Sequence, residues 1–334
     1  MESKGFALFD RFPGLATLPR AILGTFPSPV DHVQVAGGPE IWLKRDDRNA
    51  PVAAGNKVRA LEFLLGPVRA GDLVLAVGGQ GSTHVYATAV HAERLGARTA
   101  AILWPHAMHP VSEAVSRAIA RRCVSETQSR WAASALVRAM AWRIAAHRAG
   151  TGRHYLPPGG SNPLGVLGHV NAGLELARQI ADGVLPTPTH VVVPLGTGGT
   201  AAGLALGLGV AGVETTVVAA RVAPAVVANQ YRVQALIRRT RRLIRRLDQT
   251  ALVLPAVPVV VDHAVYGGEY GRPLAAGASA AECLRIAALQ AGAEPVVLDA
   301  TYAAKAAASA IKLAATGRVL LWMTFDGRPF TDAT

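Results

Sequence analysis

The chain has 334 residues, of which 51% are hydrophobic, and a formal net charge of +12, so it can bury one large core or two linked ones. It has no run of about 18 uncharged apolar residues and no basic stretch followed by an apolar core at its start, so we expect neither a membrane span nor a secretory signal. Cys123 and Cys283 lie far apart and match no metal-ligand spacing, which favours a reduced, cytoplasmic setting without a bound metal.

Short apolar runs alternate with helical stretches along the chain. The apolar runs that predict strands cover residues 73–77, 99–104, 191–193, 217–220 and 319–323. Glycine-rich loops follow the first and third of these runs, and a helical stretch follows each loop. Buried strands that alternate with helices predict a parallel α/β architecture. The proline- and glycine-rich residues 157–163 form the strongest loop and a plausible seam between domains.

Lysine is scarce in this chain and occurs only at positions 4, 44, 57, 305 and 312. Unlike arginine, a lysine can form an imine once its ammonium group has lost a proton. Lys57 follows a Gly-Asn turn and precedes an apolar helical stretch, a junction from which it can point into a cleft; an ordinary surface lysine is the alternative. Lys44 lies beside acidic residues and is interpreted as a member of a structural ion pair. Lys305 and Lys312 are interpreted as solvated residues of an alanine-rich helix.

Residues 78–84, Gly-Gly-Gln-Gly-Ser-Thr-His, join a predicted strand to a predicted helix that runs from Ser82 to about Leu95. Free N–H groups at the start of that helix suit a carboxylate. Ser82 can reach a reacting atom from this position, although a serine here is more commonly only the N-cap of the helix. The histidine pairs 84/91 and 106/109 have no third ligand at a recognisable spacing, so we interpret them as packing or surface residues.

A second glycine loop, Gly196-Thr197-Gly198-Gly199-Thr200, lies between a predicted strand and a predicted helix. Its glycines let the backbone approach a ligand closely, and the helix start favours an anion. Together with the two threonine hydroxyls, these features describe a phosphate-binding loop; an ordinary tight turn is the alternative. The loop lacks the Gly-Lys-Ser/Thr of a P-loop and the glycine spacing of a dinucleotide-binding fingerprint.

The densest basic run covers residues 238–246. Apolar residues recur at helical spacing through and around it, which predicts an amphipathic surface helix with a solvated arginine face. A patch that binds nucleic acid or an acidic partner is the alternative. No helix-turn-helix, zinc-finger or RNA-binding aromatic signature accompanies the run, so we expect no nucleic-acid partner.

Taken together and in this order, the motifs resemble those of the D-cysteine desulfhydrase and 1-aminocyclopropane-1-carboxylate (ACC) deaminase family. That family belongs to fold type II of the pyridoxal 5′-phosphate (PLP) enzymes, the tryptophan synthase β-subunit-like group. The matching segments extend over most of the chain and comprise residues 43–65, 78–84, 159–165, 196–200, 268–271 and 301–305.

The resemblance implies that PLP is the cofactor, that Lys57 holds it through a Schiff base, and that Lys57 moves the α-proton of a small amino acid. The catalytic residues that it implies are Lys57, Ser82, Tyr270 and Tyr302. Besides Lys57, the cofactor-binding residues that it implies are Asn56, Thr83, Gly196, Thr197, Gly198, Gly199, Thr200 and Thr324. Among these, residues 196–200 would hold the phosphate and Thr324 would face the pyridine nitrogen. The implied substrate-binding residues are Ser82, Thr83, His84 and Tyr270, with backbone groups of residues 82–84 taking the substrate carboxylate.

The chain departs from the family pattern at four positions, Thr83, Ala303, Phe325 and Asp326. Thr83 lacks the amide that the family commonly carries there, which changes its contact with the ring hydroxyl of the cofactor. ACC deaminases have a glutamate at the Ala303 position and a leucine at the Thr324 position. Both differences favour desulfhydrase chemistry over ACC ring opening, although desulfhydrases usually carry a hydroxyl residue in place of Ala303.

We therefore expect a PLP-dependent lyase or deaminase that carries out a D-cysteine desulfhydrase-like α,β-elimination, giving a 2-oxo acid, ammonia and a thiol or sulfide. ACC deaminase-like, β-replacement or racemase activity in a specialised pathway is one alternative. A catalytically silent binding homologue is an alternative of another class.

The fold that we expect is α/β, with two three-layer α/β/α domains and mostly parallel sheets, as in PLP fold type II. Residues 1–58 plus 166–334 are predicted to form the large PLP-binding domain, and residues 59–165 the small substrate-side domain. The cleft between the two would hold the cofactor. The resemblance also implies a homodimer.

Overall fold

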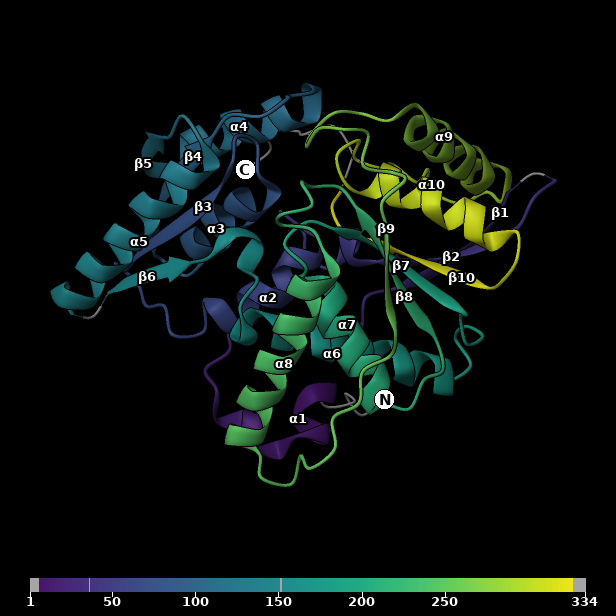
Figure 1. Cartoon of the computed structure of the whole chain (residues 1–334), viewed down its shortest axis with the longest axis horizontal. Helices are drawn as coiled ribbons and strands as arrows, with labels where there is room; N and C mark the ends of the chain where they lie inside the picture. The colour runs from purple at the N-terminus through teal and green to yellow at the C-terminus, as the bar shows by residue number, and fades with distance from the viewer. Residues whose placement is uncertain (1–5, 36, 151, 327–334) are drawn as a thin grey trace.

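The computed structural model describes residues 6–35, 37–150 and 152–326. Their strands form two sheets (Figure 1). The larger sheet has the strand order β1 (Val30–Gln34), β2 (Glu40–Arg45), β10 (Val319–Met323), β7 (His190–Leu195), β8 (Thr216–Arg221) and β9 (Val259–Asp262). The smaller sheet has the order β5 (Cys123–Gln128), β4 (Arg98–Trp104), β3 (Leu73–Gly79) and β6 (Arg153–Leu156). All described strand pairs are parallel except β1 with β2.

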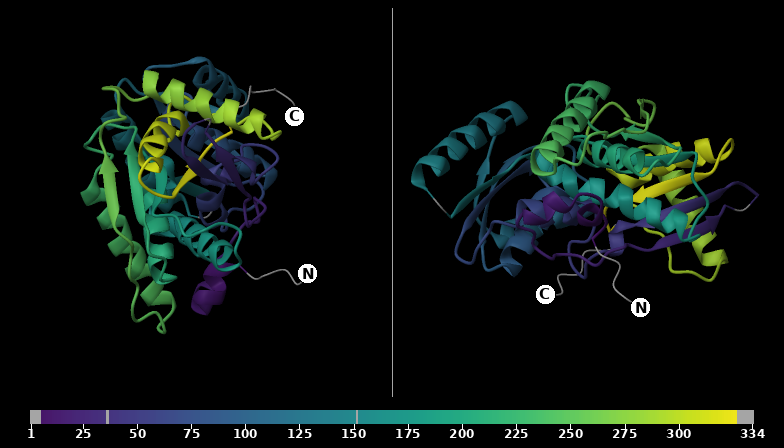
Figure 2. Two further views of the ribbon diagram at one scale, coloured as in Figure 1. Left: turned by 90° about the vertical axis from the view of Figure 1, so that its right-hand side faces the viewer. Right: turned by 90° about the horizontal axis from the view of Figure 1, so that it is seen from below.

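Helices cover both faces of each sheet (Figures 1 and 2). They are α1 (Ala7–Arg11), α2 (Asn56–Leu64), α3 (Thr83–Arg94), α4 (Pro110–Arg122), α5 (Ala132–Ala149), α6 (Pro163–Ala181), α7 (Gly199–Val210), α8 (Gln230–Leu247), α9 (Ala275–Gln290) and α10 (Ala303–Ala314). Short 3₁₀ helices, η1 (Pro13–Thr17), η2 (Asp46–Arg48) and η3 (Pro158–Gly160), complete the described helical elements. In the part of the chain that the structure describes, no helix combines the length and the apolar character that crossing a membrane requires.

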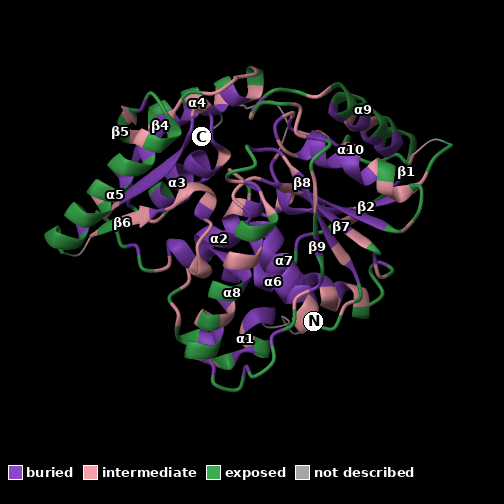
Figure 3. Ribbon diagram, in the orientation of Figure 1, coloured by how far each residue is buried: buried purple, intermediate pink, exposed green. Residues whose placement is uncertain are grey.

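Alternate side chains of each central strand enter different cores, which is why the strands are apolar without interruption. In β7, Val191 and Val193 pack with the core beneath α6, α7 and α8, whereas Val192 packs on the opposite face with α9 and α10. In β3, Ala76 packs against α3 and α4, and Val77 packs against α5. Figure 3 shows buried strands between helices whose outer faces are exposed. The predicted three-layer α/β/α architecture with mostly parallel sheets is confirmed.

The predicted strands all exist, with the bounds given above, but several short strands gave no sequence signal. Those not predicted are β1, β2, β5, β6 and β9. The structure also extends β3 through Gly79, so the first two glycines of the predicted 78–81 loop belong to the strand. The amphipathic helix around residues 238–246 is confirmed as part of α8, which buries Val233, Leu236, Ile237 and Ile244 and exposes most of its arginines.

Two of the lysine interpretations can be compared with the structure. Lys44 is fully buried and forms an ion pair with Glu175 at 2.5 Å, so its structural role is confirmed. The interpretation of Lys305 as solvated is wrong: its side chain is fully buried and its ammonium group donates to the carbonyl of Tyr266 at 2.7 Å. The helical face of α10 that carries Lys305 packs against the larger sheet, which an alanine-rich sequence does not reveal. Lys312 is exposed, as expected.

The contact between α2 and α6 depends on a glycine. A Cβ atom on Gly168 of α6 would lie 1.9 Å from the carbonyl oxygen of Arg59 in α2. The two helices therefore approach each other backbone to backbone, and α2 carries Lys57 two residues before Arg59.

We predict that Gly168→Ala lowers the free energy of unfolding by at least about 2 kcal/mol, because a methyl group there must push α6 away from α2. Chemical denaturation of the cofactor-free protein measures the change. The control is Gly183→Ala, where φ is +75° but no other atom lies within 4 Å of the new Cβ, and backbone strain alone should cost about 1 kcal/mol. Equal stability of the two variants would contradict the close approach of these helices.

Candidate active site

Three parallel strands from the two sheets end at one cavity. β3 leads into Ser82 and Thr83, β7 leads into the loop of residues 196–200, and β10 leads into Thr324. Ligands of open α/β sheets bind at the carboxyl ends of the strands, because the loops and the N-termini of the following helices converge there. The cavity has two connecting parts, which share Lys57, Thr83, Gly196, Thr197 and Tyr302.

The inner part is a small pocket with a cavity volume of about 40 Å³. It is lined by Asn56, Lys57, Thr83, Ser161, Pro194, Gly196, Thr197, Gly198, Gly199, Thr200, Tyr302, Thr324 and Phe325. Gly198 caps the start of α7 with φ +91°, a left-handed conformation that favours glycine. A Cβ on Gly196 would meet no other atom within 4 Å, so this backbone is open to a ligand. The geometry suits a phosphate, because the N–H groups of the first turn of α7 have no carbonyl partner within the helix.

The threonine hydroxyls of this loop are held from two sides. Thr200 Oγ1 accepts a hydrogen bond from the side-chain amide of Asn56 at 2.8 Å. Thr197 Oγ1 shares a hydrogen bond of 2.6 Å with the hydroxyl of Ser161. Asn56 stands directly before Lys57, so the first of these bonds connects the loop of residues 196–200 to the start of α2.

Lys57 lies where the two parts of the cavity meet, in the first turn of α2. The residue that caps this helix, Gly55, has φ +136°, and a Cβ there would lie 2.4 Å from the carbonyl oxygen of Thr324. Burial lowers the pKa of Lys57 from its usual 10.5 to about 8, because the charged ammonium loses hydration. A larger share of its amine is therefore neutral near pH 7 than in a solvated lysine.

Thr324 gives the most specific test of whether the residues present fit a cofactor. Its hydroxyl is buried, lines the inner part of the cavity and has no hydrogen-bond partner among the described residues. A buried hydroxyl without a partner is costly, so such groups commonly serve a ligand. PLP offers a pyridine nitrogen as a partner for this hydroxyl and a phosphate for residues 196–200, so the cavity fits that cofactor.

The outer part of the cavity is a wider cleft with a cavity volume of about 400 Å³. Besides Lys57, its lining includes the expected Ser82, Thr83, His84, Tyr270 and Tyr302. The Ser82 hydroxyl accepts a long hydrogen bond of 3.4 Å from the N–H of Val85, so Ser82 is the N-cap of α3. This arrangement leaves the hydroxyl proton for another partner. The first N–H groups of α3 open toward the same cleft and suit a carboxylate.

Two tyrosines form a pair across the cleft. The hydroxyls of Tyr270 and Tyr302 are in hydrogen-bond contact, and the two ring centroids are 6.1 Å apart. Burial raises the pKa of Tyr270 to about 12 and raises the pKa of Tyr302 well above its usual 10. Both phenols are therefore protonated at neutral pH and can donate hydrogen bonds. Burial, together with the charge of Lys57, lowers the pKa of His84 to about 3, so this imidazole is neutral.

The structure also contains site residues to which the sequence analysis assigned no role. Ser161 binds the phosphate loop, and its only sequence signal is its place in the matching segment 159–165. Asp299 accepts hydrogen bonds from the N–H groups of Tyr302 at 2.7 Å and Ala303 at 3.0 Å, and so holds Tyr302 at the start of α10. The ring of His106 lies 4.7 Å from that of Tyr270, edge to face. Among the described residues, no group of three or more His, Cys, Asp or Glu is arranged to hold a metal.

Comparison with known proteins decides the family. The profile of the family described as pyridoxal-phosphate dependent enzyme matches residues 23–322. The chain belongs to this family. Its cofactor is therefore PLP, and the resemblance inferred from the sequence motifs is confirmed.

Relatives in this family carry several different activities. The chain is 34% identical over 317 residues to a nocardicin C-9′ epimerase from Nocardia uniformis subsp. tsuyamanensis, with 87% of each chain covered. It is 31% identical over 316 residues to a D-cysteine desulfhydrase from Salmonella choleraesuis, with 89% of each chain covered. It is 31% identical over 252 residues to a putative ACC deaminase from Pyrococcus abyssi, with 73% of each chain covered. A crystal structure of an ACC deaminase homologue has the same fold, with a TM-score of 0.77 at 24% identity and coverage of 97% of this chain and 96% of that one.

We predict that the rate at which the cofactor-free enzyme binds PLP covalently rises with pH and levels off above pH 8. Only the neutral amine of Lys57 attacks an aldehyde, and its pKa is about 8. Rapid mixing between pH 6 and 10, followed by the absorption of the lysine-bound cofactor, measures this rate. Lys57→Arg is the control and should give no covalent band, because a guanidinium forms no imine. A rate that climbs through pH 10 would show that Lys57 is an ordinary solvated lysine.

We predict that Gly198→Ala raises the dissociation constant for PLP about tenfold, because a side chain with φ near +91° distorts the N–H groups that bind the phosphate. Equilibrium dialysis of the cofactor-free variant measures the constant. Gly212→Ala is a matched control: its φ is +73°, no other atom lies within 4 Å of the new Cβ, and the residue is outside the cavity. Equal PLP affinity of the two variants would remove residues 196–200 from the phosphate site.

Proposed function

We propose that this PLP enzyme removes the α-hydrogen of a small amino acid as a proton and expels a β-substituent, as in D-cysteine desulfhydration. The products would be a 2-oxo acid, ammonia and a thiol or sulfide. The observation that carries this proposal is the place of Lys57: an amine with a lowered pKa lies between a phosphate-binding loop and a cleft that holds Ser82 and the tyrosine pair. When bound, PLP withdraws electrons from the α-carbon of the substrate and so makes its hydrogen acidic.

Each residue of the cavity has a defined task in this proposal. The backbone and hydroxyl groups of residues 196–200 bind the cofactor phosphate. The Thr324 hydroxyl meets the pyridine nitrogen as a neutral partner, so it adds no positive charge to the ring. Lys57 takes up the α-proton, which its neutral amine can accept near pH 8. The N–H groups at the start of α3 bind the substrate carboxylate and orient the α-hydrogen toward Lys57.

The tyrosine pair supplies the proton that a departing group needs. Both phenols are protonated at neutral pH, and their hydroxyls contact each other beside Ser82 in the cleft lining. A hydrogen bond from Tyr302 or Ser82 stabilises negative charge that develops on a leaving sulfur or oxygen. Ala303 is fully buried and offers only a methyl group where ACC deaminases have a glutamate, which supports β-elimination over ring opening.

Exchange at the α-carbon alone, that is racemisation or epimerisation, is the second candidate. The 34% identity to an epimerase favours it. The apolar part of the cleft lining also favours this candidate. It is formed by Trp104, Ala132, Pro224 and Val227, in addition to the expected site residues. A cleft of about 400 Å³ has room for a side chain larger than that of cysteine, and exchange of the α-hydrogen requires no leaving group.

Features of the whole molecule that were predicted from the sequence form part of the same proposal. These are a homodimer, a cytoplasmic setting, and a division into a large unit of residues 1–58 plus 166–334 and a small unit of residues 59–165. The smaller sheet, formed within residues 73–156, supports this division. Sedimentation of the purified enzyme tests the dimer.

We predict that D-cysteine gives pyruvate and sulfide, and that Lys57→Ala lowers this rate at least 1000-fold because the proton acceptor is lost. A panel of D-cysteine, L-cysteine, D-serine and ACC, assayed for 2-oxo acid, measures the reaction. The same panel, with larger D- and L-amino acids added, is incubated in D₂O and analysed for deuterium at the α-carbon. Lys312→Ala, on the exposed face of α10, is the control and should keep wild-type rates.

Two outcomes would contradict elimination. Deuterium uptake without 2-oxo acid from any substrate would favour epimerisation instead. An enzyme that binds PLP but exchanges no α-hydrogen in the whole panel would overturn the role of Lys57 in proton transfer.

A further inference from the structure

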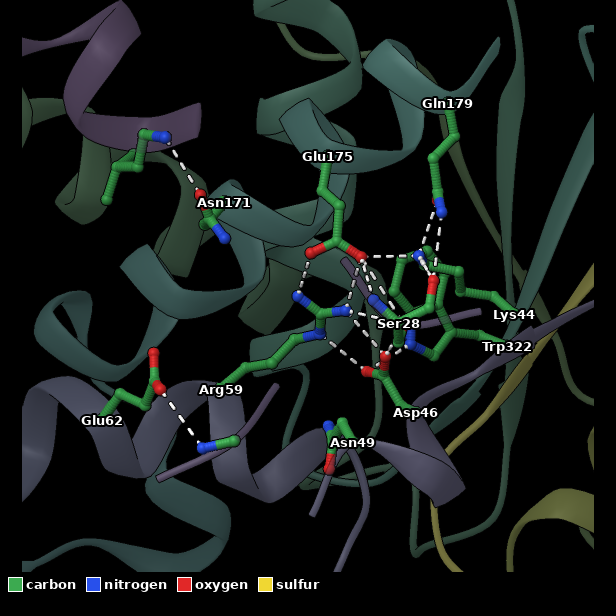
Figure 4. A network of polar contacts seen from close by, with 12 residues as sticks. Ser28, Lys44, Asp46, Asn49, Arg59, Glu62, Asn171, Glu175, Gln179 and Trp322 are labelled. Atoms are coloured by element: carbon green, nitrogen blue, oxygen red, sulfur yellow. Dashed lines mark hydrogen bonds and ion pairs between the residues drawn. The ribbon is translucent and has the colours of Figure 1, made fainter. Parts of the chain in front are cut away.

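A network of buried charges lies beside the active site without lining it (Figure 4). Its charged members come from four separate elements: Lys44 from β2, Asp46 from η2, Arg59 from α2 and Glu175 from α6. All four are buried, and the two positive and two negative charges balance. Buried charges are tolerated only when they are paired and hydrogen-bonded, so the positions of these four elements are tightly coupled.

The Asp46 carboxylate is the centre of this network. Oδ1 accepts hydrogen bonds from Arg59 Nη2 at 2.7 Å and from the Ser28 hydroxyl at 2.7 Å. Oδ2 accepts hydrogen bonds from Arg59 Nε at 2.8 Å and from the indole Nε1 of Trp322 at 2.8 Å. Four donors on one fully buried carboxylate fix its position and orientation.

The remaining contacts keep the network ionised. Arg59 Nη1 donates to Glu175 Oε2 at 2.8 Å, and Lys44 donates to Glu175 Oε1 at 2.5 Å. Burial alone would raise the pKa of Asp46, but the neighbouring Arg59 and Lys44 hold it below its usual value. The carboxylate is therefore charged, which makes its hydrogen bonds to Arg59 and Trp322 strong.

The two donors Arg59 and Trp322 stand next to the cofactor-binding residues in the chain. Arg59 lies two residues after Lys57 in α2, and Trp322 lies two residues before Thr324 at the end of β10. The same two elements also meet at the cavity, where the N–H of Asn56 donates to the carbonyl of Thr324 at 3.1 Å. Asp46 thus joins α2 to β10 at a second point, away from the cavity.

We propose that Asp46 is a positioning residue that sets the distance between Lys57 and Thr324 by holding Arg59 and Trp322 together. The inference rests on the cofactor-binding roles proposed above for Lys57 and Thr324. Two points of attachment fix the orientation of α2 relative to β10, whereas the contacts at the cavity, the Asn56–Thr324 hydrogen bond and the bridge between Gly55 and Phe325, hold only the start of the helix. The end of β10 stays paired with β2 when the Asp46–Trp322 bond is lost, but α2 then loses its second attachment, and Lys57 is no longer held at a fixed distance from the Thr324 hydroxyl.

The test uses Trp322→Phe, which removes the indole N–H and keeps an aromatic ring in the core, while the ion pairs between Asp46, Arg59 and Glu175 stay intact. We expect a roughly tenfold weaker PLP affinity of the cofactor-free protein, because Lys57 and Thr324 are no longer held at a fixed distance from each other. We also expect a shifted pH midpoint of the absorption band of the lysine-bound cofactor. Trp42→Phe is the matched control, because Trp42 lies opposite Leu320 on the adjacent strand β2 and makes no contact with Asp46 that the structure records.

A double-mutant cycle separates positioning from simple loss of stability. In a Thr324→Val background there is no hydroxyl to position, so Trp322→Phe should no longer change the pH midpoint of the band. A thermal unfolding curve of each variant accompanies the cycle. If Trp322→Phe lowers only the unfolding temperature, or shifts the band equally in both backgrounds, the network is structural and the proposal is overturned.

Asp46→Asn provides a second variant, in which we expect a larger loss of PLP affinity than in Trp322→Phe. If Asp46→Asn fails to fold, the Trp322→Phe cycle still decides the question. The outcome is also separable from that of the proposed function, because PLP affinity and the absorption band require no amino-acid substrate. A wild-type enzyme that binds PLP at Lys57 but converts no amino acid would overturn the proposed function alone; one that binds no PLP at Lys57 would overturn both.

Discussion

The close approach of Gly55 to Thr324 is the constraint on which the site depends. A glycine with φ +136° lets the start of α2 lie against the end of β10, where a Cβ would be 2.4 Å from a carbonyl oxygen. The hydrogen bond from the N–H of Asn56 to that carbonyl closes the contact. As a result, Lys57 and the Thr324 hydroxyl, which are far apart in the chain, line one cavity. Gly168 allows α6 to pack directly against the backbone of α2. The Asp46 carboxylate connects α2 to β10 at a second point, through hydrogen bonds from Arg59 and Trp322.

Three lysines, of which Lys44 and Lys305 are fully buried and Lys57 is half-buried, have different roles in the structure. Burial lowers the pKa of each, because an ammonium group loses hydration in the interior. At Lys44 the neighbouring Glu175 opposes this effect, and the pair is part of the scaffold. The ammonium group of Lys305 donates a hydrogen bond to the backbone carbonyl of Tyr266 at 2.7 Å. Lys57 instead lines both parts of the cavity, so an amine with a lowered pKa is accessible to a ligand there.

The chain covers most of the length of three relatives that differ in activity by name: an epimerase, a desulfhydrase and a putative deaminase. A shared scaffold therefore fixes where the cofactor lies and leaves the reaction to the residues of the cleft. In this chain the cleft presents a neutral imidazole at His84 and two protonated phenols at Tyr270 and Tyr302.

The structural features that depend on residues close together in the chain could be predicted from the sequence alone. The turn after β7 needs glycine at 198, and α3 needs a cap at Ser82, so both junctions were predicted from local chemistry. Strands β3, β4, β7, β8 and β10 were predicted because burial on both faces makes them mostly apolar. The interior strand β2 was missed because it begins with Glu40 and ends in Lys44 and Arg45, and β5 and β6 lie at the edges of the smaller sheet and carry many polar residues. Contacts between distant segments were decided only by the tertiary structure. Lys44 meets Glu175 across 131 positions and Asp46 meets Trp322 across 276, and no local pattern specifies a partner at such separation. The pairing of Tyr270 with Tyr302 and the burial of Lys305 arise in the same way, because they depend on how α10 packs against the sheet and on the loops that follow β9.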